Sequence, residues 1–82
     1  MVKNNQISYG IIIKNLRKSN NLSQTELGNL VGVSKSSISA YELETAIPSI
    51  QTFIDICNAC HAKITINFNN LTFELEKLSR EF

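Results

Sequence analysis

Two cysteines and a histidine form the most recognisable chemical motif in this chain. Cys57, Cys60 and His61 spell C-x-x-C-H, the spacing at which c-type haem is attached. Haem attachment needs an exported chain and a second axial ligand, and the only methionine is the first residue. A zinc site needs about four ligands, and a redox-active C-x-x-C belongs to a thioredoxin-like βαβ context. We therefore expect the two cysteines to be small buried residues, and His61 to face solvent at a helix C-terminus.

The remaining polar residues do not form a pattern that is typical of a catalytic site. The sequence places no nucleophile beside a base, and no pair of carboxylates marks a pocket. We therefore predict that the protein is not an enzyme and uses no cofactor or metal. Its function is expected to lie in a surface that binds another molecule.

Composition indicates one small globular domain. The chain has 82 residues, of which 43% are hydrophobic and 18% are charged, and its net charge is +1. A strongly basic tail is therefore excluded, although the first 18 residues carry four basic side chains and no acidic one. No segment approaches the ~20 apolar residues of a membrane helix, and the polar N-terminus does not resemble a signal peptide. These features predict a cytoplasmic protein, and the small core that this length allows favours dimerisation.

Apolar periodicity and capping residues predict four helices. The first covers about 8–19, and the second begins with a capping box at 23–26 and stops at Gly32. The third runs over about 34–43, and the fourth begins at Ser49, directly after a proline. The side chains expected to point inward are Tyr9, Ile12, Ile13, Leu16, Leu27, Leu30, Val31, Ile38, Tyr41, Ile50, Phe53, Ile54, Cys57 and Cys60.

After the fourth helix the pattern changes to strict alternation. Residues 63–68 alternate between polar and apolar side chains, which predicts a strand, and the two asparagines at 69–70 are a turn candidate. A hairpin across this turn would pair Phe68 with Leu71, Ile66 with Phe73, and Ile64 with Leu75. Helical spacing of the leucines at 71, 75 and 78 and of Phe82 leaves a helix as an alternative. We favour the hairpin, because a helix does not explain Phe73.

The second and third helices, joined by a tight turn at Gly32, form a helix-turn-helix unit. The sequence reads IKNLR at 13–17, LSQTEL at 22–27, GVS at 32–34, IS at 38–39 with E at 42, and IPSI at 47–50. These residues, at these positions, resemble the lambda-repressor/Cro-like (XRE) family over about residues 10–62. The resemblance implies a mainly helical, lambda-repressor-like fold in which the third helix enters the major groove of DNA.

The resemblance also implies a role for individual residues. Lys35, Ser36, Ser39 and Ala40 would contact base edges, where lysine can donate to guanine and an alanine methyl can meet a thymine methyl. Gln24, Lys14 and Ser37 would contact phosphates, and Gln24 would also brace the third helix. Arg17 and Glu42 match a pair that a salt bridge often joins in the family. Family members commonly have Asn-Gly where this chain has Leu43-Glu44, so we expect an acid to face a phosphate there and to lower the affinity per half-site.

The predicted strand after the helices makes the chain resemble one group within this family, the HipB-like antitoxins. The chain divides into a helix-turn-helix domain at 1–62 and a C-terminal arm at 63–82. In HipB-like antitoxins such a strand joins its twin from a second copy, which implies a dimer interface formed by Ile64, Ile66 and Phe68. The resemblance thus implies a homodimeric repressor of a palindromic operator, with a kinase-type toxin as a further partner in a HipBA-like operon. The alternatives are a phage Cro-like repressor and a helix-turn-helix protein-interaction module that binds DNA weakly.

Overall fold

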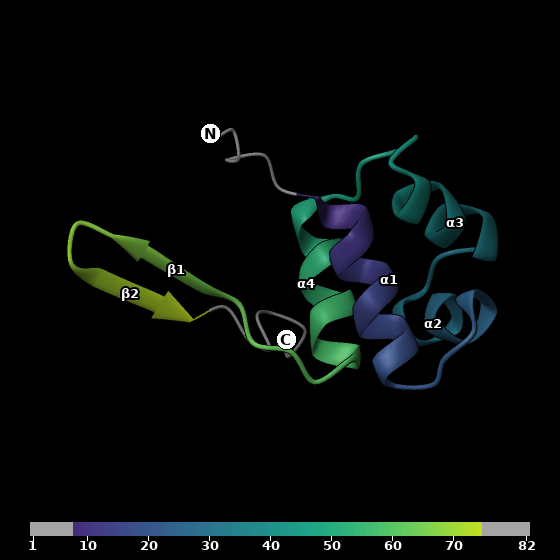
Figure 1. Cartoon of the computed structure of the whole chain (residues 1–82), viewed down its shortest axis with the longest axis horizontal. Helices are drawn as coiled ribbons and strands as arrows, with labels where there is room; N and C mark the ends of the chain where they lie inside the picture. Colours follow the sequence, from purple (N-terminus) through teal and green to yellow (C-terminus); the bar gives the residue numbers. More distant parts are fainter. Residues whose placement is uncertain (1–7, 75–82) are drawn as a thin grey trace.

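Four helices form one body, and a two-stranded hairpin extends from it to one side (Figure 1). The computed structural model describes residues 8–74. The elements, in chain order, are α1 (Tyr9–Ser19), α2 (Gln24–Val31), α3 (Lys35–Leu43), α4 (Ile50–Ala59), β1 (Thr65–Phe68) and β2 (Leu71–Glu74). The mainly helical architecture with a C-terminal hairpin is the one that the sequence predicts. In the described part of the chain, no helix is long and apolar enough to span a membrane.

Serine N-caps start three of the four helices where the sequence predicts them. The hydroxyl oxygens of Ser23, Ser34 and Ser49 each accept a hydrogen bond of 3.0 Å from the backbone N–H three residues later. At α2 the side chain of Glu26 also accepts from the backbone N–H of Ser23, which completes the capping box. Gly32 ends α2 with a φ of +78°, a left-handed conformation that glycine adopts without strain.

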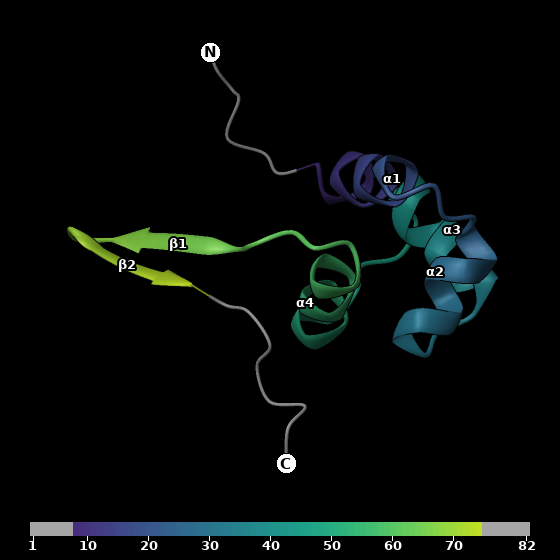
Figure 2. The ribbon, with the colours of Figure 1, turned by 90° about the horizontal axis from the view of Figure 1, so that it is seen from below.

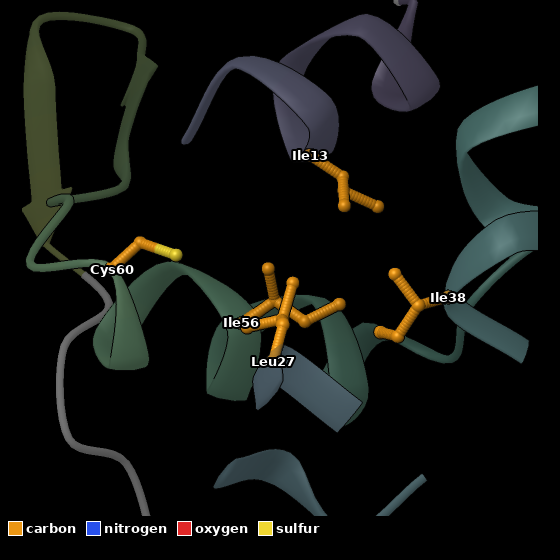
Figure 3. Packing of buried hydrophobic residues seen from close by; sticks show 5 residues of the cluster. All are labelled: Ile13, Leu27, Ile38, Ile56 and Cys60. Carbon is orange, nitrogen blue, oxygen red and sulfur yellow. The ribbon is translucent and has the colours of Figure 1, made fainter. Parts of the chain in front are cut away.

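Each helix contributes to one hydrophobic core. Figure 3 shows Ile13, Leu27, Ile38 and Ile56, which are completely buried, together with Cys60 just after α4. This central cluster takes one side chain from each of the four helices. Because the helices are only 8–11 residues long, few side chains on each one reach the centre.

Three side chains that the sequence predicts to point inward are exposed, and one buried side chain is not among the predicted ones. Ile12 is 39% exposed, Leu30 60% and Ile50 72%, whereas Ile56, which was not predicted to point inward, is completely buried. Successive residues of a helix point about 100° apart, so two neighbours are both buried only where other elements pack on both of their sides, as for Ile56 and Cys57 of α4. Ile12, beside the buried Ile13, is not covered in this way. A short helix that packs on one side buries a narrower stripe than the apolar pattern of the sequence suggests.

The hairpin has the predicted register. Its pairs are Thr65 with Glu74, Ile66 with Phe73, Asn67 with Thr72, and Phe68 with Leu71. Asn69 and Asn70 have φ angles of +49° and +69°, and two positive φ angles in a two-residue loop are typical of a type I′ turn. The helix considered as an alternative is therefore wrong for 71–74. The predicted pair of Ile64 with Leu75 lies outside the described residues.

The hairpin stands apart from the helical body. Seen from below, it projects away from the helices along most of its length (Figure 2). All side chains of the central core cluster, and those packed against it, lie between Tyr9 and Cys60 in the part of the chain that is described. On the hairpin, Ile66 is 45% exposed and Leu71 is 56% exposed.

Candidate nucleic-acid interface

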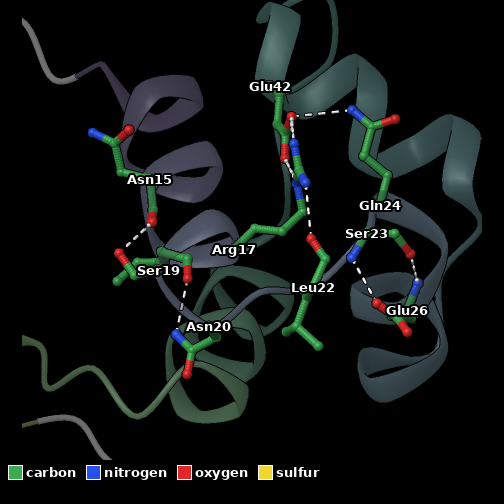
Figure 4. Close-up of polar contacts among 10 residues, drawn as sticks. Asn15, Arg17, Ser19, Asn20, Leu22, Ser23, Gln24, Glu26 and Glu42 are labelled. Carbon is green, nitrogen blue, oxygen red and sulfur yellow. Dashed lines mark hydrogen bonds and ion pairs between the residues drawn. The ribbon is translucent and has the colours of Figure 1, made fainter.

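An arginine on α1 holds the helix-turn-helix unit in place (Figure 4). The Nε and Nη2 atoms of Arg17 donate to the two carboxylate oxygens of Glu42 on α3, at 2.6 and 3.1 Å. Its Nη1 donates to the carbonyl of Leu22, which precedes α2, at 2.9 Å. The side chains of Arg17 and Glu42 are only 11% and 5% exposed. This two-point contact fixes both the distance and the angle between α1 and α3.

The first residue of α2 joins the same junction. The side-chain amide of Gln24 donates to Oε1 of Glu42 at 3.0 Å, so α2 is tied directly to α3. Burial would by itself raise the pKa of Glu42. The hydrogen bonds from Arg17 and Gln24 and the positive charges of Arg17 and Lys14 outweigh burial and lower this pKa. The carboxylate is therefore ionised at neutral pH and holds three segments together.

The outer face of α3 borders an open hollow of about 360 Å³. The four residues predicted to contact bases all line it, and so does Gln24. Two further residues of this hollow, which the sequence analysis did not select, are Leu43 and Thr45. The complete lining is Gln24, Lys35, Ser36, Ser39, Ala40, Leu43 and Thr45. The spacing of 36, 40 and 43 along one helix could have identified Leu43, because residues three and four apart share a face.

The other two predicted phosphate contacts do not line this hollow. Ser37 lies in the first turn of α3, where its hydroxyl oxygen accepts a hydrogen bond from the Ser34 hydroxyl at 3.1 Å. Lys14 is exposed on α1, close enough to the Arg17–Glu42 pair for its charge to lower the pKa of Glu42. Lys14 therefore borders the junction of α1 and α3 rather than the outer face of α3.

Glu44, the acid expected to face a phosphate, bonds to the start of α1 within the chain. Its Oε2 accepts hydrogen bonds from the backbone N–H of Gly10 at 2.9 Å and from the Ser8 hydroxyl at 3.2 Å. The carboxylate thus caps the N-terminus of α1, where Ser8 makes no side-chain cap of its own. Close approach requires Gly10, because a Cβ there would lie 2.5 Å from the carbonyl oxygen of Glu42. Glu44 adopts a left-handed φ of +63° at the end of α3.

The residues predicted for dimerisation lie on or next to the hairpin, away from the α3 face. Ile64 is partly buried just before β1, and Ile66 is exposed within it. Phe68, the last residue of β1, pairs through its backbone with Leu71. The hairpin therefore carries the predicted interface on an element that the core does not cover.

The two cysteines of the C-x-x-C-H motif are buried, as expected. Cys57 and Cys60 are free thiols that are 3% and 4% exposed. Burial, together with the neighbouring Cys60, raises the pKa of Cys57 to about 11. His61 is exposed directly after α4. Within residues 8–74, no three potential metal-ligating side chains come together.

Comparison with known proteins places this geometry in a family. A family model described as helix-turn-helix matches residues 13–66, about two-thirds of the chain. The chain belongs to the lambda-repressor/Cro-like helix-turn-helix family. One similar solved structure is the P22 c2 repressor protein in complex with a synthetic operator, determined in the presence of Tl⁺. The two share 30% sequence identity with a TM-score of 0.63, and the match covers 70% of this chain and 85% of that one. No curated protein sequence matches the chain.

This membership identifies the protein as a DNA-binding transcriptional regulator and confirms the lambda-repressor-like fold. In the family arrangement, the first helix of the unit crosses the DNA backbone and the second enters the major groove. Here these helices are α2 and α3. The hollow on the outer face of α3 is therefore the candidate nucleic-acid interface.

Proposed function

We propose that this protein is a sequence-specific repressor that acts as a homodimer on a palindromic operator. The observation that carries the proposal is the convergence of Gln24 with the four predicted base-contacting residues around one open hollow. In this proposal Lys35, Ser36, Ser39 and Ala40 contact base edges. Gln24, Lys14 and Ser37 contact phosphates.

The junction of Arg17, Glu42 and Gln24 supports this proposal, because it makes the interface rigid before DNA binds. A recognition helix that is already fixed loses little conformational entropy on binding. The charges also agree with the proposal. Lys35 is the one charged residue that lines the hollow. Both acids near the C-terminal end of α3 are engaged elsewhere, because Glu42 accepts hydrogen bonds from Arg17 and Gln24 and the Glu44 carboxylate is directed to α1. A cation in the major groove can donate to the O6 and N7 atoms of guanine.

The hairpin supports the proposed homodimer. In this proposal the arm at 63–82 joins the arm of a second copy through Ile64, Ile66 and Phe68. A hairpin has two unpaired edges, and pairing one of them across a two-fold axis would cover both the edge and the exposed apolar side chains. Two recognition helices in such a dimer would have to lie about 34–36 Å apart to reach successive major grooves. The P22 c2 repressor was solved with an operator, which agrees with occupation of DNA as the mode of repression.

A HipB-like antitoxin is the biological role that we favour for this repressor, and the observation behind it is the strand that follows the helices. In that role the protein would bind a kinase-type toxin and repress their common operon. A Cro-like phage repressor is the alternative. Co-purification with the product of a neighbouring gene would support the antitoxin, and a phage repressor should purify without such a partner.

Binding to the DNA upstream of its own gene tests the proposal. Affinity is measured by fluorescence anisotropy at two salt concentrations for the wild type and for the Lys35→Ala/Ser36→Ala variant. We expect the wild-type affinity to fall steeply with salt, because phosphate contacts release counterions. The variant should lose about 5- to 150-fold per half-site on this DNA, the range for one good base contact. Lys63→Ala removes one charge from the base of the hairpin and should bind like the wild type.

Two results would contradict the proposal. One is a folded wild-type protein that does not distinguish this DNA from an unrelated duplex. The other is equal loss of affinity in the Lys63→Ala control. Either result would favour the protein-interaction module, whose helix-turn-helix fold no longer reads DNA.

A further inference from the structure

The outer face of α3 changes in character along the helix. Lys35 and Ser36 at its N-terminal end are polar, whereas Ala40 and Leu43 towards its C-terminal end are apolar. Leu43 is the last residue of α3 and is 72% exposed, yet it lines the same hollow as the polar residues. An exposed leucine within a DNA-reading surface needs an apolar partner there, because it would otherwise desolvate polar base edges.

Leu43 lies in line with the base-contacting residues. Ser36, Ala40 and Leu43 follow at intervals of four and three residues, so they form one row along the helix. Lys35 and Leu43 are eight residues apart, which is about 12 Å along a helix axis. The major groove is about 12 Å wide, and base pairs are about 3.4 Å apart. Lys35 and Leu43 are therefore far enough apart along the helix axis to reach positions about three or four base pairs apart.

The surroundings keep the Leu43 end of the hollow free of charge. The carboxylate of the next residue, Glu44, is held at the N-terminus of α1. The Thr45 hydroxyl is directed to the carbonyl of Ala40, at 3.4 Å. Lys35 is the charged residue of the lining, and it lies at the opposite end of α3. The C-terminal end of the row therefore offers methyl groups and no ionised group.

We infer that Leu43, together with Ala40, reads the 5-methyl group of a thymine about three or four base pairs from the position that Lys35 contacts. Among the features of the major groove, the thymine methyl is the apolar one. Leu43 is thus a specificity-determining residue of the operator. This inference rests on the proposed DNA binding and adds a base preference to it.

The test replaces thymine by deoxyuridine, which keeps the base pair and removes only the methyl group. An operator is first selected with the full chain from a pool of random duplexes. Each thymine is then replaced symmetrically in both half-sites, and affinities are measured for the wild type, Leu43→Ala and Leu43→Met. Leu30→Ala is the matched control, because Leu30 is also an exposed leucine, at 60%, but lies on α2 and does not line the hollow.

We expect one symmetric thymine position at which deoxyuridine weakens wild-type binding about fourfold per half-site, or about 15-fold in total, as for the loss of one buried methyl. Leu43→Ala should weaken binding to the thymine duplex by at least this factor. It should lose much less affinity with deoxyuridine than the wild type does, because only Ala40 still contacts the methyl group. Leu43→Met, which keeps an apolar side chain of similar length, should retain sensitivity to deoxyuridine. Leu30→Ala should behave like the wild type.

Three results would overturn the inference. The first is the same set of deoxyuridine penalties in Leu43→Ala as in the wild type. The second is an equal loss of affinity of Leu43→Ala for the operator and for unrelated DNA, which would indicate a contact with the sugar-phosphate backbone. The third is failure of the selection to yield any bound duplex, which would overturn the proposed function as well. Circular dichroism of each variant separates these results from loss of the fold.

Discussion

The helical body contains a buried apolar core, whereas no described side chain of the hairpin belongs to that core. In the helices, Ile13, Leu27 and Ile38 are completely buried, whereas on the hairpin Ile66 is 45% and Leu71 56% exposed. The polar contacts differ in the same way. The Arg17–Glu42 pair of the helices is nearly buried, and the Lys63–Glu74 pair of the hairpin is about half exposed, at 3.8 Å.

This difference assigns DNA contact to the helices and, in our proposal, dimerisation to the hairpin. The helices cover their own core and position the outer face of α3 within one chain. The candidate nucleic-acid interface is therefore formed without a second copy. The hairpin leaves apolar surface uncovered, and in our proposal a second copy covers it. The predictions below test this separation, beginning with the largest expected effect.

Loss of Glu42 should have the largest effect on stability. Glu42→Ala leaves the guanidinium of Arg17 nearly buried without its carboxylate, and removal of one partner from a buried pair costs about 3–5 kcal/mol. Domains of this kind are stabilised by about 5–15 kcal/mol, so much of the population would unfold under mild denaturant. The free energy of unfolding is measured by urea titration with circular dichroism.

Glu74→Ala is the matched control, because it removes the same group from the exposed pair of the hairpin. Its effect should stay below about 1 kcal/mol. Equal effects of Glu42→Ala and Glu74→Ala would contradict the contrast between the two regions.

A charge on the apolar face of the hairpin should disrupt the dimer and leave the helices intact. Ile66→Asp would place two carboxylates near the two-fold axis of the proposed interface, and we expect the dimer to dissociate at least about 100-fold more readily. Asn67→Asp adds the same charge to the other face of β1 and should leave the dimer intact. Sedimentation equilibrium measures the dissociation constants. A wild-type protein that stays monomeric at high concentration would refute the proposed dimer.

Glu44 should respond differently to two small substitutions. Glu44→Ala removes the carboxylate cap from α1 but keeps a side chain at a φ of +63°, and should cost about 1–2 kcal/mol. Glu44→Gly loses the same cap and relieves about 1 kcal/mol of backbone strain, so it should be the more stable of the two. Thermal unfolding of both variants measures the difference. If the glycine variant were the less stable one, the left-handed φ at this position would not strain the alanine variant, which would contradict the prediction.

Acid should weaken the junction of α1 and α3 through Glu42. The folded state lowers the pKa of this carboxyl below its ordinary value of 4.5. Its contribution to stability is therefore fully present above that value and is lost as the pH falls through the lower pKa of the folded state. As the pH falls from neutral through 4.5 and below, the wild type should lose more stability than Glu42→Gln, which cannot titrate at this position. If the free energy of unfolding depended on pH in the same way for both proteins, titration of Glu42 would not contribute to the loss of stability in acid.

The sequence predicted the elements that depend on local rules. Serine caps and Gly32 marked the helix ends, and period-two alternation with the asparagine turn set the register of the hairpin. These features depend on residues within a few positions of one another. The fold class, which follows from their order, could therefore be predicted as well.

The features that depend on distant contacts were not predicted. The capping of α1 by Glu44 joins residues 34 positions apart, and the sequence pattern does not show where that carboxylate points. The exposure of Ile50 depends likewise on which side of α4 the other helices cover. Leu43 stands where family members commonly have Asn, and only its spacing from Ser36 and Ala40 along α3 indicates that it lines the hollow.

The central claim is that the N-terminus of α2 and the outer face of α3 contact DNA while the hairpin serves assembly. Titration of a selected operator duplex into ¹⁵N-labelled protein tests it directly, because every backbone amide reports its own surroundings. We predict that the largest shift changes occur at Gln24 and from Lys35 to Leu43, and that the amides of β1 and β2 change little. Large changes confined to the hairpin, with α3 unaffected, would contradict the account.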